Sequence, residues 1–73
     1  MQPFQLRSYS LTELAQLYRP HLSPRSAART LRNWIRRNPE LLASLAATSF
    51  NPDTVRTLTP LQVSIIISYL GEP

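Results

Sequence analysis

The chain has 73 residues, which suffices for one domain (residues 1–73) with a thin hydrophobic core, and it contains no cysteine. Disulfides and thiolate metal sites are therefore excluded, so stability must come from packing, helix capping or a second copy of the chain. All eight basic residues are arginine, and with four acidic residues they give a net charge of +4.

Capping signals mark four helix starts. Ser10, followed three residues later by Glu13, forms a capping box ahead of an apolar segment. Each of the other starts places an N-cap residue before a proline at the first helical position: Ser23-Pro24, Asn38-Pro39 and Thr59-Pro60. These signals predict helices over residues 11–18, 24–38, 39–47 and 60–70, and Gly71 suits the end of the last one.

Two short segments have the alternation of polar and apolar residues that is typical of strands. They are residues 4–7 and residues 55–58, and we expect them to pair as a minimal two-strand ribbon. The predicted fold is thus mainly α, a small helix-turn-helix-like bundle of about four helices with this strand pair.

The second helix carries most of the charge: Arg25, Arg29, Arg32, Arg36 and Arg37. At about 100° per residue, the first four fall in one narrow sector, which we call the arginine face, and the apolar residues fall opposite. Like charges one turn apart repel by a few tenths of a kcal/mol, and no acidic residue occurs between Glu13 and Glu40. We therefore expect the arginine face to bind an anion, with a nucleic-acid backbone favoured.

Other interpretations of this helix stay open. The arginine face could be a solvated or internally paired surface, or it could meet an acidic protein partner, and RNA is not separated from duplex DNA. Arg37 is expected to reach a flanking phosphate. Polar contacts at the edge are expected from Ser26, Thr30 and Asn33. We expect Trp34 to be a core residue rather than a surface on which a base stacks.

The last helix has two apolar stripes. The stripe of Val63, Ile66, Ile67 and Leu70 suits the core. The second consists of Leu61, Ile65 and Tyr69. Either it is a homodimer contact, or the N-terminal Phe4 and Leu6 cover it.

No constellation for catalysis is recognised in the sequence. His21 is the single histidine and is expected in a loop, and no spacing suits a metal, a cofactor or an acid–base pair. We expect neither an enzyme nor a small-molecule substrate. The apolar run at residues 65–67 is too short to cross a bilayer, and the N-terminus lacks a signal-peptide core. We expect no membrane partner and a cytoplasmic location.

Two resemblances add to these expectations. The segment Leu14-Ala-Gln-Leu-Tyr18, a turn, and Ala28-Arg-Thr-Leu-Arg-Asn-Trp-Ile35 resemble the helix-turn-helix of bacterial DNA-binding domains, which implies that the second helix is the recognition helix. Across nearly the whole chain, down to the closing Tyr69-Leu-Gly-Glu-Pro73, the sequence resembles a family of short uncharacterised proteins from Bacteroides-type bacteria. That family is a domain of unknown function. The resemblance therefore implies the domain limits and the helical structure, and it does not supply an activity.

The favoured function is therefore that of a small intracellular DNA-binding accessory or regulatory protein that uses an arginine-rich helix. The alternative is a homodimeric interaction or adaptor module.

Overall fold

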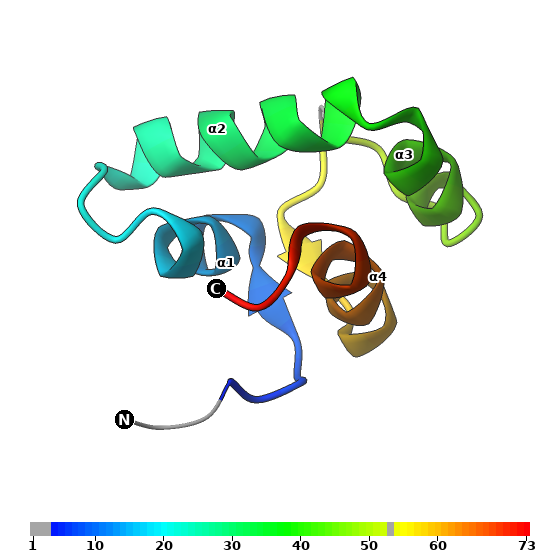
Figure 1. Cartoon of the computed structure of the whole chain (residues 1–73), viewed down its shortest axis with the longest axis horizontal. Helices are drawn as coiled ribbons and strands as arrows, with labels where there is room; N and C mark the ends of the chain where they lie inside the picture. The colour runs from blue at the N-terminus through cyan, green and yellow to red at the C-terminus, as the bar shows by residue number, and fades with distance from the viewer. Residues whose placement is uncertain (1–3, 53) are drawn as a thin grey trace.

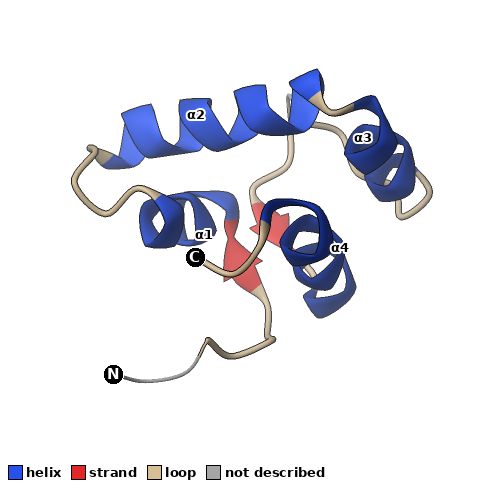
Figure 2. Ribbon diagram, viewed as in Figure 1, coloured by secondary structure: helices blue, strands red, loops and turns tan. Residues whose placement is uncertain are grey.

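The structure is a computed structural model that describes residues 4–52 and 54–73. Within those residues it is mainly helical, with four helices and one antiparallel strand pair (Figure 1, Figure 2), which confirms the expected fold class. The elements are β1 (Tyr9–Ser10), α1 (Leu11–Tyr18), α2 (Pro24–Arg37), α3 (Pro39–Ala46), β2 (Thr57–Leu58) and α4 (Pro60–Leu70).

Each helix begins at the predicted cap. In the capping box of α1, the backbone N–H of Glu13 donates to Ser10 Oγ (3.0 Å), and the Glu13 carboxylate accepts from the Ser10 N–H (3.0 Å). Asn38 ends α2, and its Oδ1 accepts from the Leu41 N–H at the start of α3 (3.1 Å). The helix bounds lie within one residue of those predicted because such caps satisfy the first backbone donors of a helix.

The strand pair exists, but the prediction of its first strand was wrong. Tyr9 pairs with Leu58 and Ser10 with Thr57, so β1 follows residues 4–7 instead of including them. The reason is burial: Tyr9 and Leu58 both belong to the core, whereas most of residues 4–7 are exposed. The second strand falls inside the predicted range 55–58.

The helices surround one core. α2 runs along one side of the molecule, and α1 packs mainly against it. α3 lies beyond the C-terminal end of α2, and α4 lies below that end and packs against α3 (Figure 1). The central side chains are fully buried: Leu11, Leu14, Leu31, Ile35, Leu41, Leu45, Leu58, Val63 and Ile66. In the described ranges no helix has the length and apolar character needed to cross a membrane.

Trp34 departs from its expected place. It is half-buried and packs against the core from its edge, so the expectation of a core position is confirmed only in part. The Tyr18 ring meets it edge-on, with the ring centroids 5.9 Å apart. Trp34 therefore contributes to packing and to the surface at once.

The second apolar stripe of α4, which consists of Leu61, Ile65 and Tyr69 and which we call the α4 stripe, remains largely open. Leu61 is 60% exposed and Tyr69 is 41% exposed, while Ile65 packs partly against the core. Phe4 and Leu6 are the N-terminal residues that would cover it in the alternative interpretation. Phe4 instead stacks on Tyr9, and Leu6 is itself 58% exposed.

Candidate functional site

The arginine face of α2 forms a shallow pocket of about 530 Å³. Its lining residues all come from α2: Arg25, Ser26, Arg29, Arg32, Asn33 and Arg36. Among the residues that the structure describes, the lining includes no acidic side chain. The sequence spacing thus produces a concentrated positive surface, as the helical wheel predicts.

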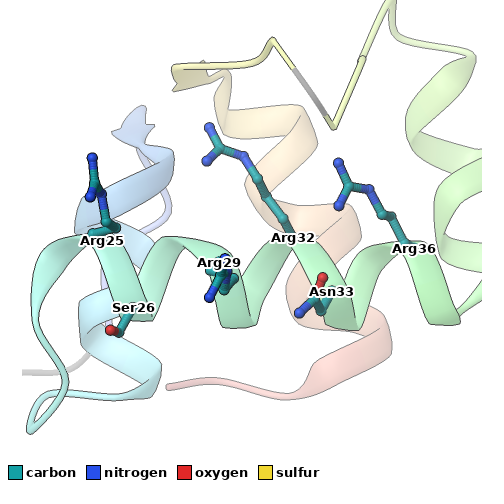
Figure 3. A pocket seen from close by; sticks show the side chains of 6 residues that line it. All are labelled: Arg25, Ser26, Arg29, Arg32, Asn33 and Arg36. Carbon is teal, nitrogen blue, oxygen red and sulfur yellow. The ribbon is translucent and has the colours of Figure 1, made fainter.

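The four guanidinium groups extend along one side of the helix axis. In Figure 3, Arg25, Arg32 and Arg36 extend in a similar direction, and Arg29 projects toward the viewer between them. Arg25, Arg29 and Arg36 are exposed. The row from Arg25 to Arg36 spans about 16 Å at 1.5 Å per residue. It can therefore meet several anionic groups of one ligand.

Arg32 differs from the other members of the face, and the expectation that it is exposed was wrong. It is half-buried, and its Nε donates to the Pro52 carbonyl (3.0 Å). Its Nη2 donates to the Val55 carbonyl (3.2 Å). Arg32 thus fastens the segment between α3 and β2 against α2 while leaving its positive charge in the pocket lining.

The other predicted contacts divide between two places. Ser26 and Asn33 line the arginine pocket as expected. Thr30 is not in its lining, and its hydroxyl donates to the Ser26 carbonyl within α2 (2.9 Å). Arg37 is exposed but lines a different pocket, beside Trp34, so the structure does not group it with the arginine face.

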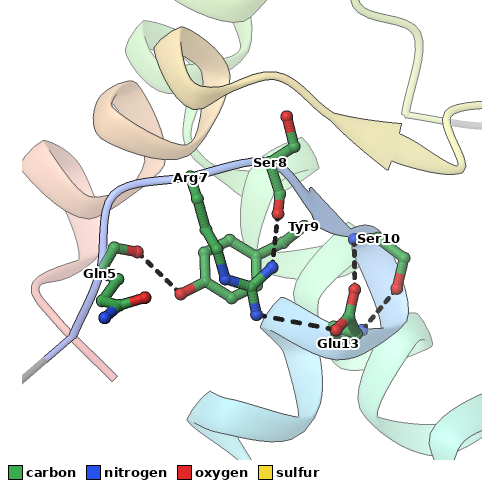
Figure 4. A network of polar contacts seen from close by, with 6 residues as sticks. All are labelled: Gln5, Arg7, Ser8, Tyr9, Ser10 and Glu13. Carbon is green, nitrogen blue, oxygen red and sulfur yellow. Dashed lines mark hydrogen bonds and ion pairs between the residues drawn. The ribbon is translucent and has the colours of Figure 1, made fainter. Parts of the chain in front are cut away.

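A separate polar cluster holds the N-terminal segment (Figure 4). The Arg7 guanidinium lies over the Tyr9 ring, 3.9 Å from its centroid, and lies 3.9 Å from the Glu13 carboxylate. The Tyr9 hydroxyl donates to the Gln5 carbonyl (2.7 Å). The backbone hydrogen bond from Ser10, assisted by Arg7, keeps the pKa of Glu13 below its usual value, although partial desolvation opposes this. Arg7 and Glu13 therefore serve the local fold of this segment.

The structure also places the histidine and the candidate metal ligands of the described residues. His21 is exposed in the connection between α1 and α2. Within residues 4–52 and 54–73, no three His, Cys, Asp or Glu side chains gather in a way that could hold a metal ion. The arginine face offers hydrogen-bond donors and positive charge, which suit recognition of oxyanions.

Comparison with known proteins places the chain in one family. No curated protein matches it, and no solved structure matches it. One family model, described as "Domain of unknown function (DUF4248)", matches residues 5–73. Since this match covers nearly the whole chain, the protein belongs to that family of domains of unknown function.

Proposed function

We propose that the protein binds nucleic acid, with duplex DNA favoured, through the arginine face of α2. The observation that carries this proposal is the exposed pair Arg25 and Arg29, in one row with Arg32 and Arg36 on one side of a single helix, with no acidic side chain among the described residues of the pocket lining. Arginine forks match phosphate oxygens in pairs. The protein would act as a small cytoplasmic accessory or regulatory factor without catalytic activity.

Contacts to phosphates should outweigh contacts to bases. Because the guanidiniums form a row about 16 Å long, at 1.5 Å per residue, they match a run of phosphates along the edge of a groove. Ser26 and Asn33 lie in the same pocket and can add polar contacts to a base edge or a sugar. We also propose that α1 and α2, joined by the five residues 19–23, work as a helix-turn-helix-like unit with α2 as the recognition helix.

The salt dependence of binding tests this function. Fluorescence anisotropy of a labelled mixed-sequence duplex is measured at several salt concentrations. With Arg25 and Arg29 neutralising one phosphate each, log K against log salt should have a slope of about −1.8, at roughly −0.9 per phosphate. Single-stranded RNA of the same length is compared in parallel. Absence of binding to either nucleic acid at low salt contradicts the proposal and favours an acidic protein partner for the same face.

A second candidate function is homodimerisation through the α4 stripe. The exposed fractions of Leu61 (60%) and Tyr69 (41%) favour it, because two-fold pairing brings the same stripe against itself. Such a dimer would present two copies of α2 to a site with two half-sites. Sedimentation velocity should show a concentration-dependent dimer that Leu61→Ser abolishes. A monomer at every concentration contradicts this second function. It does not bear on the proposal that the arginine face binds DNA.

A further inference from the structure

A second pocket, which the proposed function does not use, lies on another side of α2. It has a volume of about 440 Å³ and is lined by Tyr18, Trp34, Arg37, Asn38 and Leu70. We call it the Trp34 pocket. These residues come from the C-terminal ends of α1, α2 and α4 and from the cap between α2 and α3. Three helices that are separate in sequence thus build one concave surface.

The walls of the Trp34 pocket are fixed by internal contacts. Tyr18 meets Trp34 edge-on, and its hydroxyl donates to the Gly71 carbonyl in the tail that follows α4. In Figure 1 this tail runs from α4 back toward α1. Leu70, at the end of α4, packs against the core as well as lining the pocket. A pocket whose walls are held in this way loses little conformational entropy when a ligand enters.

The polar groups of the Trp34 pocket are mainly hydrogen-bond donors. The Arg37 guanidinium and the Trp34 indole N–H can only donate. Asn38 already uses its Oδ1 to accept from the Leu41 N–H, which leaves its amide NH₂ as a donor. No Asp or Glu of the described part of the chain belongs to the lining. The complementary ligand therefore joins an apolar group to an anionic acceptor.

A protein segment fits this description better than a nucleotide base. Tryptophan, tyrosine and arginine are the residues enriched at the centres of protein–protein interfaces, where an apolar side chain fills a pocket beside a charged contact. A base would need an open face of the indole for stacking. The Arg19 guanidinium already lies over the Trp34 ring, 5.7 Å from the centroid, so a base could stack on that face only by displacing it.

We propose that the Trp34 pocket binds a peptide segment of a protein partner in which an apolar or aromatic side chain is followed by an acidic residue. The apolar side chain packs against the surface that Tyr18, Trp34 and Leu70 form together. The carboxylate pairs with Arg37, and the peptide carbonyl accepts from Asn38. The protein then connects a polyanion on the arginine face to a protein on the Trp34 pocket.

Trp34 is the only tryptophan in the chain, so every indole signal comes from a residue that lines this pocket. The probe is the capped tetrapeptide Ser-Phe-Asp-Ser, titrated into the full chain and followed by the Trp34 indole N–H resonance and by Trp34 fluorescence. The controls are the same peptide with Asn for Asp and with Gly for Phe. The first peptide should produce saturable changes, and each control should bind about tenfold more weakly, as expected for the loss of one charged hydrogen bond or of one buried side chain.

Variants of the chain locate the binding. Arg37→Gln, a surface change, should weaken the Phe-Asp peptide about tenfold and leave the Asn peptide unaffected. Arg25→Gln, on the arginine face, should change neither. Equal binding of the Asp and Asn peptides, or no response of Trp34 to any peptide, overturns the proposal. A response of the Trp34 signals to a single-stranded oligonucleotide alone overturns it in favour of a nucleotide site. Neither result bears on DNA binding by Arg25 and Arg29, which is measured separately.

Discussion

At the scale of single residues, the arginines of α2 have three different roles although their chemistry is the same. Arg25 and Arg29 are exposed on the arginine face, and Arg37 is exposed beside Trp34. Arg32 binds the carbonyls of Pro52 and Val55. The helical wheel orients all of these side chains correctly, but it contains no information on which distant segment of the chain comes to lie over one of them.

The role of Arg32 predicts a difference in stability between neighbouring arginines. Arg32→Ala should lower the free energy of unfolding by about 2 kcal/mol, because hydrogen bonds from a charged donor to two partly buried carbonyls are lost. Arg29→Ala, an exposed change, should alter it by less than about 0.5 kcal/mol. Urea unfolding followed by circular dichroism measures both. Equal effects of the two substitutions would show that the contacts of Arg32 contribute nothing to stability.

Tyr18 predicts a loss of stability at alkaline pH. Burial, and then the negative charge of Glu72, raise the pKa of Tyr18 to about 12 in the folded protein. Unfolding returns it to the ordinary tyrosine value of about 10. The contribution of neutral Tyr18 to the free energy of unfolding is therefore fully present below about pH 10, and it is lost as the pH rises from about 10 to about 12. Thermal melts over this range should show a steeper decline for the parent than for Tyr18→Phe. Parallel declines would contradict the assignment.

At the scale of elements, the sequence predicted the helices far better than the strands. A helix start depends on a local cap, such as Asn38 before Pro39, and local caps can be recognised in the sequence. The two-residue strands depend on contacts between distant residues, namely the pairing of Tyr9 with Leu58 and the hydrogen bond from the Leu11 N–H to the Arg56 carbonyl (2.8 Å). The alternation in residues 4–7 was too short to distinguish a strand from a segment that stacks Phe4 on Tyr9.

Gln62 connects α4 to the segment that follows α3, and we expect its removal to destabilise the fold. Its side chain completes the capping box of α4 by accepting from the Thr59 N–H (3.0 Å), and its amide donates to the Thr48 hydroxyl beyond α3 (3.0 Å). Gln62 is buried. Gln62→Ala should therefore lower the free energy of unfolding by about 2 kcal/mol, since it removes two partly buried hydrogen bonds together with the helix cap.

The control for this prediction is Ser68→Ala, an exposed change on the same helix whose effect should stay within about 0.5 kcal/mol. Denaturant midpoints compare the two variants. A Gln62→Ala variant as stable as Ser68→Ala would mean that water replaces the lost hydrogen bonds at no cost.

At the scale of the whole molecule, α2 separates two surfaces of different chemistry. One is the arginine face, and the other is the Trp34 pocket with its aromatic walls. The sequence predicted the first from spacing along a single helix. It did not predict the second, because that pocket needs the C-terminal ends of three helices to meet. For the same reason, the sequence did not show that Trp34 and Arg37 line one pocket.

The most direct test of the central claim compares two double variants with the same loss of charge. Arg25→Gln/Arg29→Gln removes two members of the arginine face, whereas Arg7→Gln/Arg19→Gln removes two arginines outside it. Both are titrated against the labelled duplex at several salt concentrations, with circular dichroism to confirm folding. The first should flatten the slope of log K against log salt by about 1.8, at roughly 0.9 per lost phosphate contact, and the second should leave the parent slope nearly unchanged. Equal decreases of the slope in the two variants would contradict the proposed function. They would show that DNA binding depends on the overall charge and not on the arginine face.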